Sequence, residues 1–268
     1  MTEQQSSPAP VRYGTMIAEL ASPNVGRLLQ RPGFDFIIVD CEHGPFSRET
    51  VAAIIAGTAD TDVYVRIPGP DRAAITAFLD MGAAGILAPM VSTVEEARKI
   101  AAYSKYGPIG ARGVSTVRAH TGYGVSSLND YQREANARIK TYVQIETIAG
   151  LEAAADIAAV PGIDGVVLGP SDLRADASRH GLDPEDTAFG ALHIVAAAAK
   201  ASGIESGVIA ADPAFLAAGA DLGMTFLGIG SELSFVLRGA SLHLGEVRDA
   251  VAVHRTRRDQ REQVHGRV

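Results

Sequence analysis

The chain contains a single cysteine, Cys41, among its 268 residues. One thiol cannot form an intramolecular disulfide, and it excludes a cysteine-based zinc cluster. Apart from His43, nothing near it in the sequence would activate this thiol, so we expect it to be unreactive.

The sequence also lacks a long hydrophobic run and a signal peptide. No stretch approaches the roughly 18 consecutive apolar residues that a transmembrane helix needs. The first residues, MTEQQSSPAPVRYG, are polar and proline-rich and have no apolar segment of the secretory kind. These absences predict a cytoplasmic protein without a membrane partner.

Basic residues are fewer than acidic ones: the chain has 24 Lys and Arg, 31 Asp and Glu, and a formal net charge of −7. Nucleic acids and acidic membranes favour a basic protein face, so we expect neither as a partner. A few basic residues at one site would still be enough to hold a small anionic substrate.

Short β-rich runs alternate with longer amphipathic stretches along the whole chain. Nearly continuous apolar runs are typical of parallel strands that are covered on both faces. We expect strands at 15–17, 34–40, 63–67, 85–89, 141–146, 165–168, 206–210 and 225–229. Helices are expected between them, for example at 71–81 and 94–106, and Thr93 with Glu96 forms a capping box before the second.

About eight strand–helix units fit this chain, and one closed barrel of this kind needs about 250 residues. The alternative, an open doubly wound sheet, usually has a Gly-x-Gly-x-x-Gly turn after its first strand, and none is present. We predict a (β/α)₈ TIM barrel over residues 14–250, a flexible N-terminal segment at 1–13 and a charged C-terminal tail at 251–268. The Gly- and Ser-rich segment 107–130 is too long for a simple connection and is a candidate functional loop.

Two carboxylates follow neighbouring predicted strands, where barrel enzymes place their active sites. Glu146 ends the strand at 141–146, and Asp172 lies just after the strand at 165–168. Such a pair suits a hard cation such as Mg²⁺ or Mn²⁺ better than zinc. The alternatives are surface carboxylates or, for Asp172, a helix N-cap, and we favour the metal pair.

The turn that carries Asp172 has the sequence GPSDL. Its backbone N–H groups at Ser171 and Asp172 would point from a helix N-terminus toward an anion. A plain strand-to-helix turn explains the same residues equally well.

Three further polar residues lie at predicted strand ends. Asp40 and His43 are three residues apart, so the carboxylate could orient the imidazole, and histidine is the usual general acid or base. A histidine on the surface or in packing is an equal alternative. Arg66 is costly within an apolar strand unless it is paired; it either stabilises a developing oxyanion or forms a salt bridge with Asp40 or Glu42.

Several of these segments together resemble the HpcH/HpaI class II pyruvate aldolases. The resemblance covers about residues 14–247 and rests on FDFIIVDCEHGPFS, on the stretch from YVRIPG to GARGVS, and on YVQIET and GIDGVVLGPSDL. It implies a barrel of the phosphoenolpyruvate/pyruvate type and a metal-dependent aldehyde-lyase that cleaves or forms 4-hydroxy-2-oxo acids through a pyruvate enolate. It also implies a divalent cation (Mg²⁺ or Mn²⁺, or Co²⁺), with pyruvate or oxaloacetate and an aldehyde as substrates.

The resemblance assigns roles to individual residues. It implies metal binding by Glu146 and Asp172, substrate contacts by Gln144, Ser171, Asp172 and Arg66, and catalysis by His43, Asp40 and Arg66. Asp80 matches a carboxylate that reaches the site of a neighbouring subunit. The resemblance further implies a homo-oligomer, a hexamer built as a trimer of dimers, whose subunits exchange their last helix within about residues 231–253.

Two segments depart from the family pattern: the one that begins at Arg174 and the one around Arg118, His120 and Tyr123. They leave the identity of the aldehyde open. One alternative is an enolate-forming synthase that acts on oxaloacetate, by condensation with an acyl thioester or by decarboxylation, and another is a metal-binding barrel without turnover. The set of Asp40, His43 and Arg66 argues against the second, and the absence of lysine from every predicted strand disfavours a Schiff-base mechanism.

Overall fold

The computed structural model describes residues 10–58 and 61–265. Its internal contacts divide the chain into two units, Met1–Ser231 and Glu232–Val268. The first unit contains the barrel and every site residue predicted above, and the second consists of a single helix.

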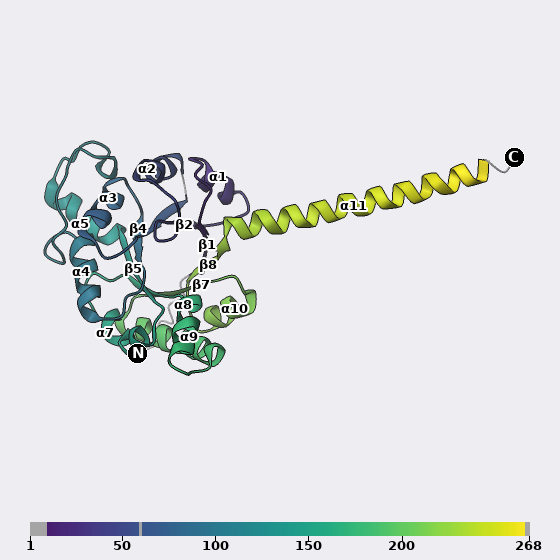
Figure 1. Ribbon diagram of the computed structural model, residues 1–268. Coiled ribbons are helices and arrows are strands. Elements are labelled where there is room, and N and C mark those ends of the chain that lie inside the picture. Colours follow the sequence, from purple (N-terminus) through teal and green to yellow (C-terminus); the bar gives the residue numbers. More distant parts are fainter. Residues whose placement is uncertain (1–9, 59–60, 266–268) are drawn as a thin grey trace, which may run out of the picture. The chain divides into compact units, whose positions relative to one another are not determined.

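Within the described residues of the first unit, eight strands close into a barrel in chain order, and helices surround them (Figure 1). Each strand is parallel to both of its neighbours. The strands are β1 (Arg12–Ile17), β2 (Phe36–Asp40), β3 (Asp62–Arg66), β4 (Gly85–Ala88), β5 (Lys140–Ile145), β6 (Gly165–Leu168), β7 (Glu205–Ala210) and β8 (Phe226–Ser231). The predicted (β/α)₈ fold is therefore confirmed.

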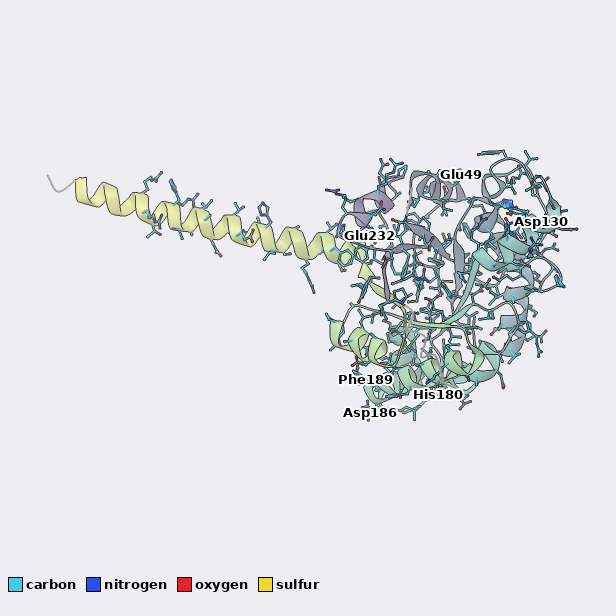
Figure 2. All side chains as sticks on the ribbon, turned by 180° about the vertical axis from the view of Figure 1, so that it is seen from behind. Glu49, Asp130, His180, Asp186, Phe189 and Glu232 are labelled. Atoms are coloured by element: carbon cyan, nitrogen blue, oxygen red, sulfur yellow. The ribbon has the colours of Figure 1, made fainter. Side chains whose placement is uncertain are left out.

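Helices follow the strands as the sequence predicts. They are α1 (Val25–Gln30), α2 (Arg48–Gly57), α3 (Arg72–Asp80), α4 (Val94–Ser104), α5 (Leu128–Arg138), α6 (Ile148–Glu152), α7 (Ala154–Ala158), α8 (Pro170–Arg179), α9 (Pro184–Ser202) and α10 (Pro213–Asp221). The capping box of Thr93 and Glu96 is present at the start of α4. Charged residues such as Glu49, Asp130 and Asp186 lie on α2, α5 and α9 at the periphery of the barrel unit (Figure 2).

The segment 107–130 is mostly irregular, as expected. It contains one short 3-10 helix, η1 (Ala119–Thr121), and ends where Ser127 caps α5. It connects α4 to α5, and β5 follows α5. Arg112 and His120 lie beside Asp80 at the end of α3, whereas a Cβ at Gly113 would lie 3.9 Å from Arg72 Nη2 at the start of that helix, so the segment runs along α3. Its functional role stays a prediction.

The first strand begins at Arg12, so two residues that we assigned to a flexible N-terminal segment belong to the barrel. The backbone N–H of Arg12 donates to the carbonyl of Thr225 at 2.7 Å. Its guanidinium donates to Tyr64 at 3.1 Å, to Tyr142 at 3.0 Å and to Glu205 at 3.1 Å. These partners are remote in sequence, which is why local hydrophobicity places the start of the strand too late.

Aromatic side chains fill the barrel near its N-terminal end, where the strands begin. Phe36 stacks on Phe226 with 4.0 Å between ring centroids, and Tyr64 and Tyr142 contact both each other and Phe226. Above them lies an aliphatic layer that includes Ile38, Leu87 and Val167. The interior is thus a packed core without a channel, as expected for a barrel of eight strands.

Side chains alternate across each strand, so every second residue points into the barrel. On β2, Asp40 is the next inward residue after Phe36 and Ile38. In the same way, Arg66 follows Tyr64 on β3, and Gln144 follows Tyr142 on β5. The polar residues at the C-terminal end therefore occupy inward positions. Toward the start of the strands, the same alternation gives inward positions to the charged residues that begin β1, β3, β5 and β7.

The second unit is α11 (Glu232–His265), a helix of 34 residues. It runs through residue 250, where we predict the boundary between the barrel domain and a tail. Its exposed apolar side chains, each between 44% and 69% exposed, are Val236, Leu237, Leu242, Leu244, Val247, Val251 and Val253. In the part of the chain that the structure describes, no helix combines the length and hydrophobicity required to cross a membrane.

Replacement of Arg12 by methionine is expected to lower the free energy of unfolding by about 2–4 kcal/mol. The change leaves the Glu205 carboxylate and the Tyr142 hydroxyl, which lie 3.1 and 3.0 Å from the guanidinium, without their charged partner. Urea denaturation measures the loss. Arg31→Met, an exposed residue of the same type, is the control and should change the midpoint little. Equal midpoints for both variants would contradict this account.

Candidate active site

An ion pair between Arg66 and Asp40 lies at the C-terminal end of the barrel. The two residues are direct partners in the register of β2 and β3. Arg66 donates from Nε to Asp40 Oδ1 at 2.8 Å and from Nη2 to Oδ2 at 2.7 Å, a bidentate geometry. Burial alone would raise the pKa of Asp40, but the hydrogen bonds and charge of Arg66 outweigh it and lower that pKa. The salt bridge that we offered as an alternative for Arg66 is therefore present.

Among the described residues, Asp40 makes no hydrogen bond to the imidazole of His43, so the predicted pairing of the two side chains stays a prediction. Its Oδ1 instead accepts the backbone N–H groups of Glu42 at 3.1 Å and His43 at 3.3 Å. The imidazole is 69% exposed, and its Nε2 lies 3.8 Å from Glu42 Oε2. The carboxylate is unavailable because a permanently charged guanidinium, held opposite it by strand register, already binds both of its oxygens.

Glu146 is the most buried carboxylate at this end, with 1% of its surface exposed. Its Oε1 accepts the backbone N–H of Met90 at 2.6 Å, whereas its Oε2 is buried and has no hydrogen-bond partner among the described residues. Burial, together with the nearby charges of Asp172 and Glu42, raises the pKa of Glu146 to about 7. A cation bound at this position would favour the ionised carboxylate.

The neighbouring groups fit a divalent cation. The charge of Asp172 acts on both Glu146 and Glu42, so three carboxylates share one electrostatic environment. Beside them, Gln144 is 3% exposed and its side-chain carbonyl oxygen has no partner among the described residues. No group of three or more His, Cys, Asp or Glu within the described part of the chain is arranged to hold a metal ion. Two carboxylates would thus leave coordination positions for substrate and water.

Gly169 allows the turn before α8 to approach these groups closely. A Cβ at this position would lie 2.3 Å from Glu146 Oε2 and 2.5 Å from Gln144 Nε2. The backbone N–H of Gly169 donates to the carbonyl of Ile145 at 3.0 Å, which ties the turn to β5. A residue with any side chain at this position would displace the Glu146 carboxylate.

Met90 is a site residue that our sequence analysis missed. It follows β4, has a φ of 56° and is 45% exposed, although left-handed backbone is unusual for a residue with a long side chain. This conformation accompanies the hydrogen bond from its N–H to Glu146. Strained backbone costs on the order of 1–3 kcal/mol and often marks functional sites. Nothing in the local sequence Ala88-Pro89-Met90 signals it.

The predicted helix N-terminus at GPSDL is confirmed. Pro170 opens α8, and Ser171 and the acidic Asp172 lie in its first turn, both exposed. The buried carboxylate of Asp176, one turn further, accepts the backbone N–H of Ile148 at 2.8 Å. This bond fixes α8 against the segment that follows Glu146, so the two predicted metal carboxylates are held on connected elements.

Asp80 is not brought to this site within the chain. It ends α3 at the N-terminal end of the barrel, where its Oδ1 accepts from Arg112 Nη2 at 2.6 Å. His120 Nε2 lies 3.6 Å from the same oxygen. The predicted role of Asp80 in the site of a neighbouring subunit stays a prediction.

Cys41 follows Asp40 directly. Burial, and then the charge of Asp40, raise the pKa of the Cys41 thiol to about 12. The thiol is therefore protonated at neutral pH, in agreement with the expectation that it is unreactive.

Comparisons with known proteins show the family to which the chain is similar. The sequence model of a family described as HpcH/HpaI aldolase/citrate lyase matches residues 15–238. A curated relative, the 4-hydroxy-2-oxovalerate aldolase of Novosphingobium aromaticivorans, is 33% identical over 249 residues, which is 91% of this chain and 92% of the relative. The family resemblance inferred from the sequence motifs is confirmed.

Solved structures are similar over most of the chain. The crystal structure of an HpcH/HpaI aldolase from Desulfitobacterium hafniense has a TM-score of 0.82 and 28% identity, and the match covers 89% of this chain and 93% of that one. The citrate synthase SbnG has a TM-score of 0.78 and 25% identity, with 90% and 94% covered. This barrel is thus similar both to an aldolase and to an enzyme of another activity.

Replacement of Gly169 by alanine is expected to weaken Mg²⁺ or Mn²⁺ binding by about tenfold or more while the protein stays folded. The added methyl group must displace Glu146 Oε2, which would lie 2.3 Å away. Isothermal titration with the metal measures the change. Gly190→Ala is the matched control, since a Cβ there, on α9, meets nothing within 4 Å. Unchanged metal affinity in Gly169→Ala would contradict the site as described.

Without metal, Glu146→Gln is expected to be more stable than the unaltered protein at pH 8 but not at pH 4.5. Since the pKa of Glu146 is raised from 4.5 to about 7, its ionisation destabilises the fold. This destabilisation is absent below pH 4.5, grows as the pH rises from 4.5 to about 7, and is complete above about pH 7. A shift of this size corresponds to at most about 3 kcal/mol.

Urea denaturation in the presence of a chelator at both pH values measures the difference. Subtraction of the two proteins at each pH removes the contribution of every other titrating group. A difference that is the same at pH 4.5 and pH 8 would show that Glu146 does not titrate in this interval.

Proposed function

The chain belongs to the HpcH/HpaI aldolase/citrate lyase family, and from this we propose that it is a divalent-metal-dependent aldolase. It would be an aldehyde-lyase that cleaves or forms 4-hydroxy-2-oxo acids through a pyruvate enolate. The observation that carries this proposal is the buried Glu146 carboxylate. One of its oxygens has no partner among the described residues, and the charges of Asp172 and Arg66 act on this carboxylate. The aldolase name of the Novosphingobium aromaticivorans relative supports it.

Glu146 and Asp172 would hold the cation, which we propose to be Mg²⁺ or Mn²⁺, or Co²⁺. Both are oxygen ligands. Burial, and then the negative charges of Asp172 and Glu42, raise the pKa of Glu146 to about 7, and a bound cation would stabilise its ionised form. When bound, a divalent cation supplies a Lewis acid for the carboxylate and carbonyl oxygens of a 2-oxo acid. Gln144 and the N–H groups of Ser171 and Asp172 would contact the substrate.

Arg66 would stabilise the negative charge that develops on the enolate oxygen. Its Nε and Nη2 donate to Asp40, and Nη1 has no hydrogen bond or ion pair with another of the described residues. The bidentate pair therefore holds the guanidinium rigidly while one nitrogen can donate to the substrate. Donors that are fixed before the reaction cost no reorganisation, and loss of one typically costs about 3–4 kcal/mol in transition-state energy.

His43 is the base that we propose for transfer of the methyl proton of pyruvate. Its exposed imidazole can reach a substrate at the C-terminal end of the barrel, and Glu42 lies 3.8 Å away to orient it. Asp40 would act on His43 through the backbone, because it accepts the His43 N–H. This arrangement, in which Asp40 accepts the backbone N–H of His43, differs from the contact between the two side chains that we expected from spacing.

The structural similarity to a citrate synthase supports a second candidate function. An enolate-forming synthase that condenses oxaloacetate with an acyl thioester would use the same Glu146, Asp172 and Arg66. Formation of free thiol from an acyl thioester in the presence of oxaloacetate would identify it. Pyruvate and an aldehyde would then give no product.

We further propose that the chain forms a homo-oligomer, a hexamer in which subunits exchange α11. The row of exposed apolar side chains on α11 supports a helix that is covered in the assembly. In such an assembly Asp80, paired with Arg112 and exposed for 20% of its side chain, would lie near a neighbouring site. We also keep the proposal that the barrel domain extends to residue 250 and that a tail follows it.

Exchange of the methyl protons of pyruvate for deuterium is expected to depend on Mg²⁺ or Mn²⁺, because enolate formation requires no aldehyde. Proton NMR in D₂O follows the loss of the methyl signal. Arg66→Gln is expected to slow the exchange by about a hundredfold or more, through loss of one oxyanion donor. Arg31→Gln, an exposed arginine, is the control. Absence of exchange with every divalent metal would rule out the pyruvate aldolase and leave the oxaloacetate–thioester reaction to be assayed.

A further inference from the structure

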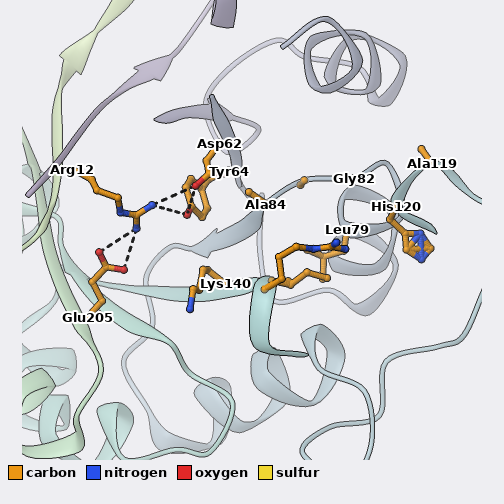
Figure 3. Close-up of a pocket in the computed structure, with 13 residues that line it drawn as sticks. Arg12, Asp62, Tyr64, Leu79, Gly82, Ala84, Ala119, His120, Lys140 and Glu205 are labelled. Atoms are coloured by element: carbon orange, nitrogen blue, oxygen red, sulfur yellow. Dashed lines mark hydrogen bonds and ion pairs between the residues drawn. The ribbon is translucent and has the colours of Figure 1, made fainter. Parts of the chain in front are cut away.

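A cavity lies at the N-terminal end of the barrel, away from the proposed active site. Its volume is about 650 Å³, within the range of small-molecule sites. Among the residues that line it are Arg12, Asp62, Lys140 and Glu205, the first residues of β1, β3, β5 and β7 (Figure 3). The aromatic layer of Phe36, Tyr64, Tyr142 and Phe226 and the aliphatic layer above it separate this cavity from Glu146.

These four charged residues form one layer of the barrel, since layers are built from the inward residues of alternate strands. Three of them, Arg12, Asp62 and Glu205, are joined by ion pairs. Arg12 binds Asp62 at 3.4 Å and Glu205 at 3.1 Å, and Figure 3 shows the guanidinium between the two carboxylates. Glu205 also accepts from Tyr142 at 2.5 Å. Both carboxylates of the layer are thus engaged by Arg12.

Lys140, the fourth member, has no side-chain hydrogen bond or ion pair within the described residues. The same holds for the guanidinium of Arg138, two residues earlier, which lines the same cavity. Leu79, Ala83 and Ala84 provide an apolar part of the wall. The cavity therefore has two cations without partners, next to a surface suited to a short carbon chain.

A buried histidine on the cavity wall adds hydrogen-bonding capacity. The His120 side chain is 2% exposed, and neither of its ring nitrogens has a hydrogen-bond partner among the described residues. Buried polar atoms without a partner are uncommon and call for a ligand or water. Burial, and then the positive charges of Arg112 and Arg138, lower the pKa of His120. Burial likewise lowers the pKa of Lys105, and its salt bridge with Asp164 opposes that shift.

We propose that this cavity binds a small organic anion, with its oxyanion held by Lys140 and Arg138 and a hydrogen bond from His120. Phosphate and carboxylate groups share the required chemistry, since both accept charge-assisted hydrogen bonds from lysine and arginine. The ligand occupies the end of the barrel at which the strands begin, so it does not compete with the 2-oxo acid. Its binding adds to the stability of the folded chain.

Isothermal titration of the full chain tests this site with two probes, glycerol 3-phosphate for the phosphate class and succinate for the carboxylate class. Ionic strength is kept constant because salt screens exposed charges. We expect saturable binding of at least one probe, weakened about tenfold by Lys140→Gln and by Arg138→Gln. Arg133→Gln is the matched control on the same helix; Arg133 is 73% exposed and paired with Asp130, and its loss should leave the affinity unchanged.

Arg66→Gln changes the proposed active site and not the cavity, so this variant should bind the probe as the unaltered protein does. Because Arg138 is exposed, its variant carries the test even if Lys140→Gln fails to fold, which circular dichroism would reveal. The proposal is overturned if neither probe binds saturably in the millimolar range. It is equally overturned if binding survives in both Lys140→Gln and Arg138→Gln, or is lost in Arg66→Gln.

Discussion

Closure of the parallel strands into a barrel is the constraint on which the rest of the structure depends. It fixes which side chain of each strand points inward, and the register then decides which inward side chains meet. Asp40 and Arg66 pair because β2 and β3 place them opposite each other, not because of any local motif. Glu146 and the Gly169 turn meet because β5 and β6 end side by side. The candidate site is thus a product of strand order.

Much of this arrangement could be predicted from the sequence. Apolar runs gave all the strands to within a few residues, because strands buried on both faces carry a strong local signal. The polar residues that end those runs, Asp40, Arg66, Gln144 and Glu146, were identified for the same reason. The start of β1 was predicted too late because Arg12 is held by partners far away in sequence, which no local pattern reveals.

Contacts that depend on exact geometry could not be predicted. Spacing placed Asp40 near His43, but hydrogen bonds to Arg66 and to backbone N–H groups occupy the carboxylate. Met90 contributes its backbone rather than its side chain, so its residue type carries no signal. The requirement for glycine at position 169 follows from a close approach across two strands, whereas the sequence GPSDL alone suggests an ordinary turn.

The aromatic and aliphatic layers inside the barrel have a consequence for communication between its two ends. Phe36 and Phe226, with Ile38, Leu87 and Val167 above them, place apolar side chains along the axis between Glu205 and Glu146. A charge added near Lys140 would influence the far end chiefly through small movements of the strands, which are shared by both ends. The barrel wall, rather than its interior, would be the mechanical link.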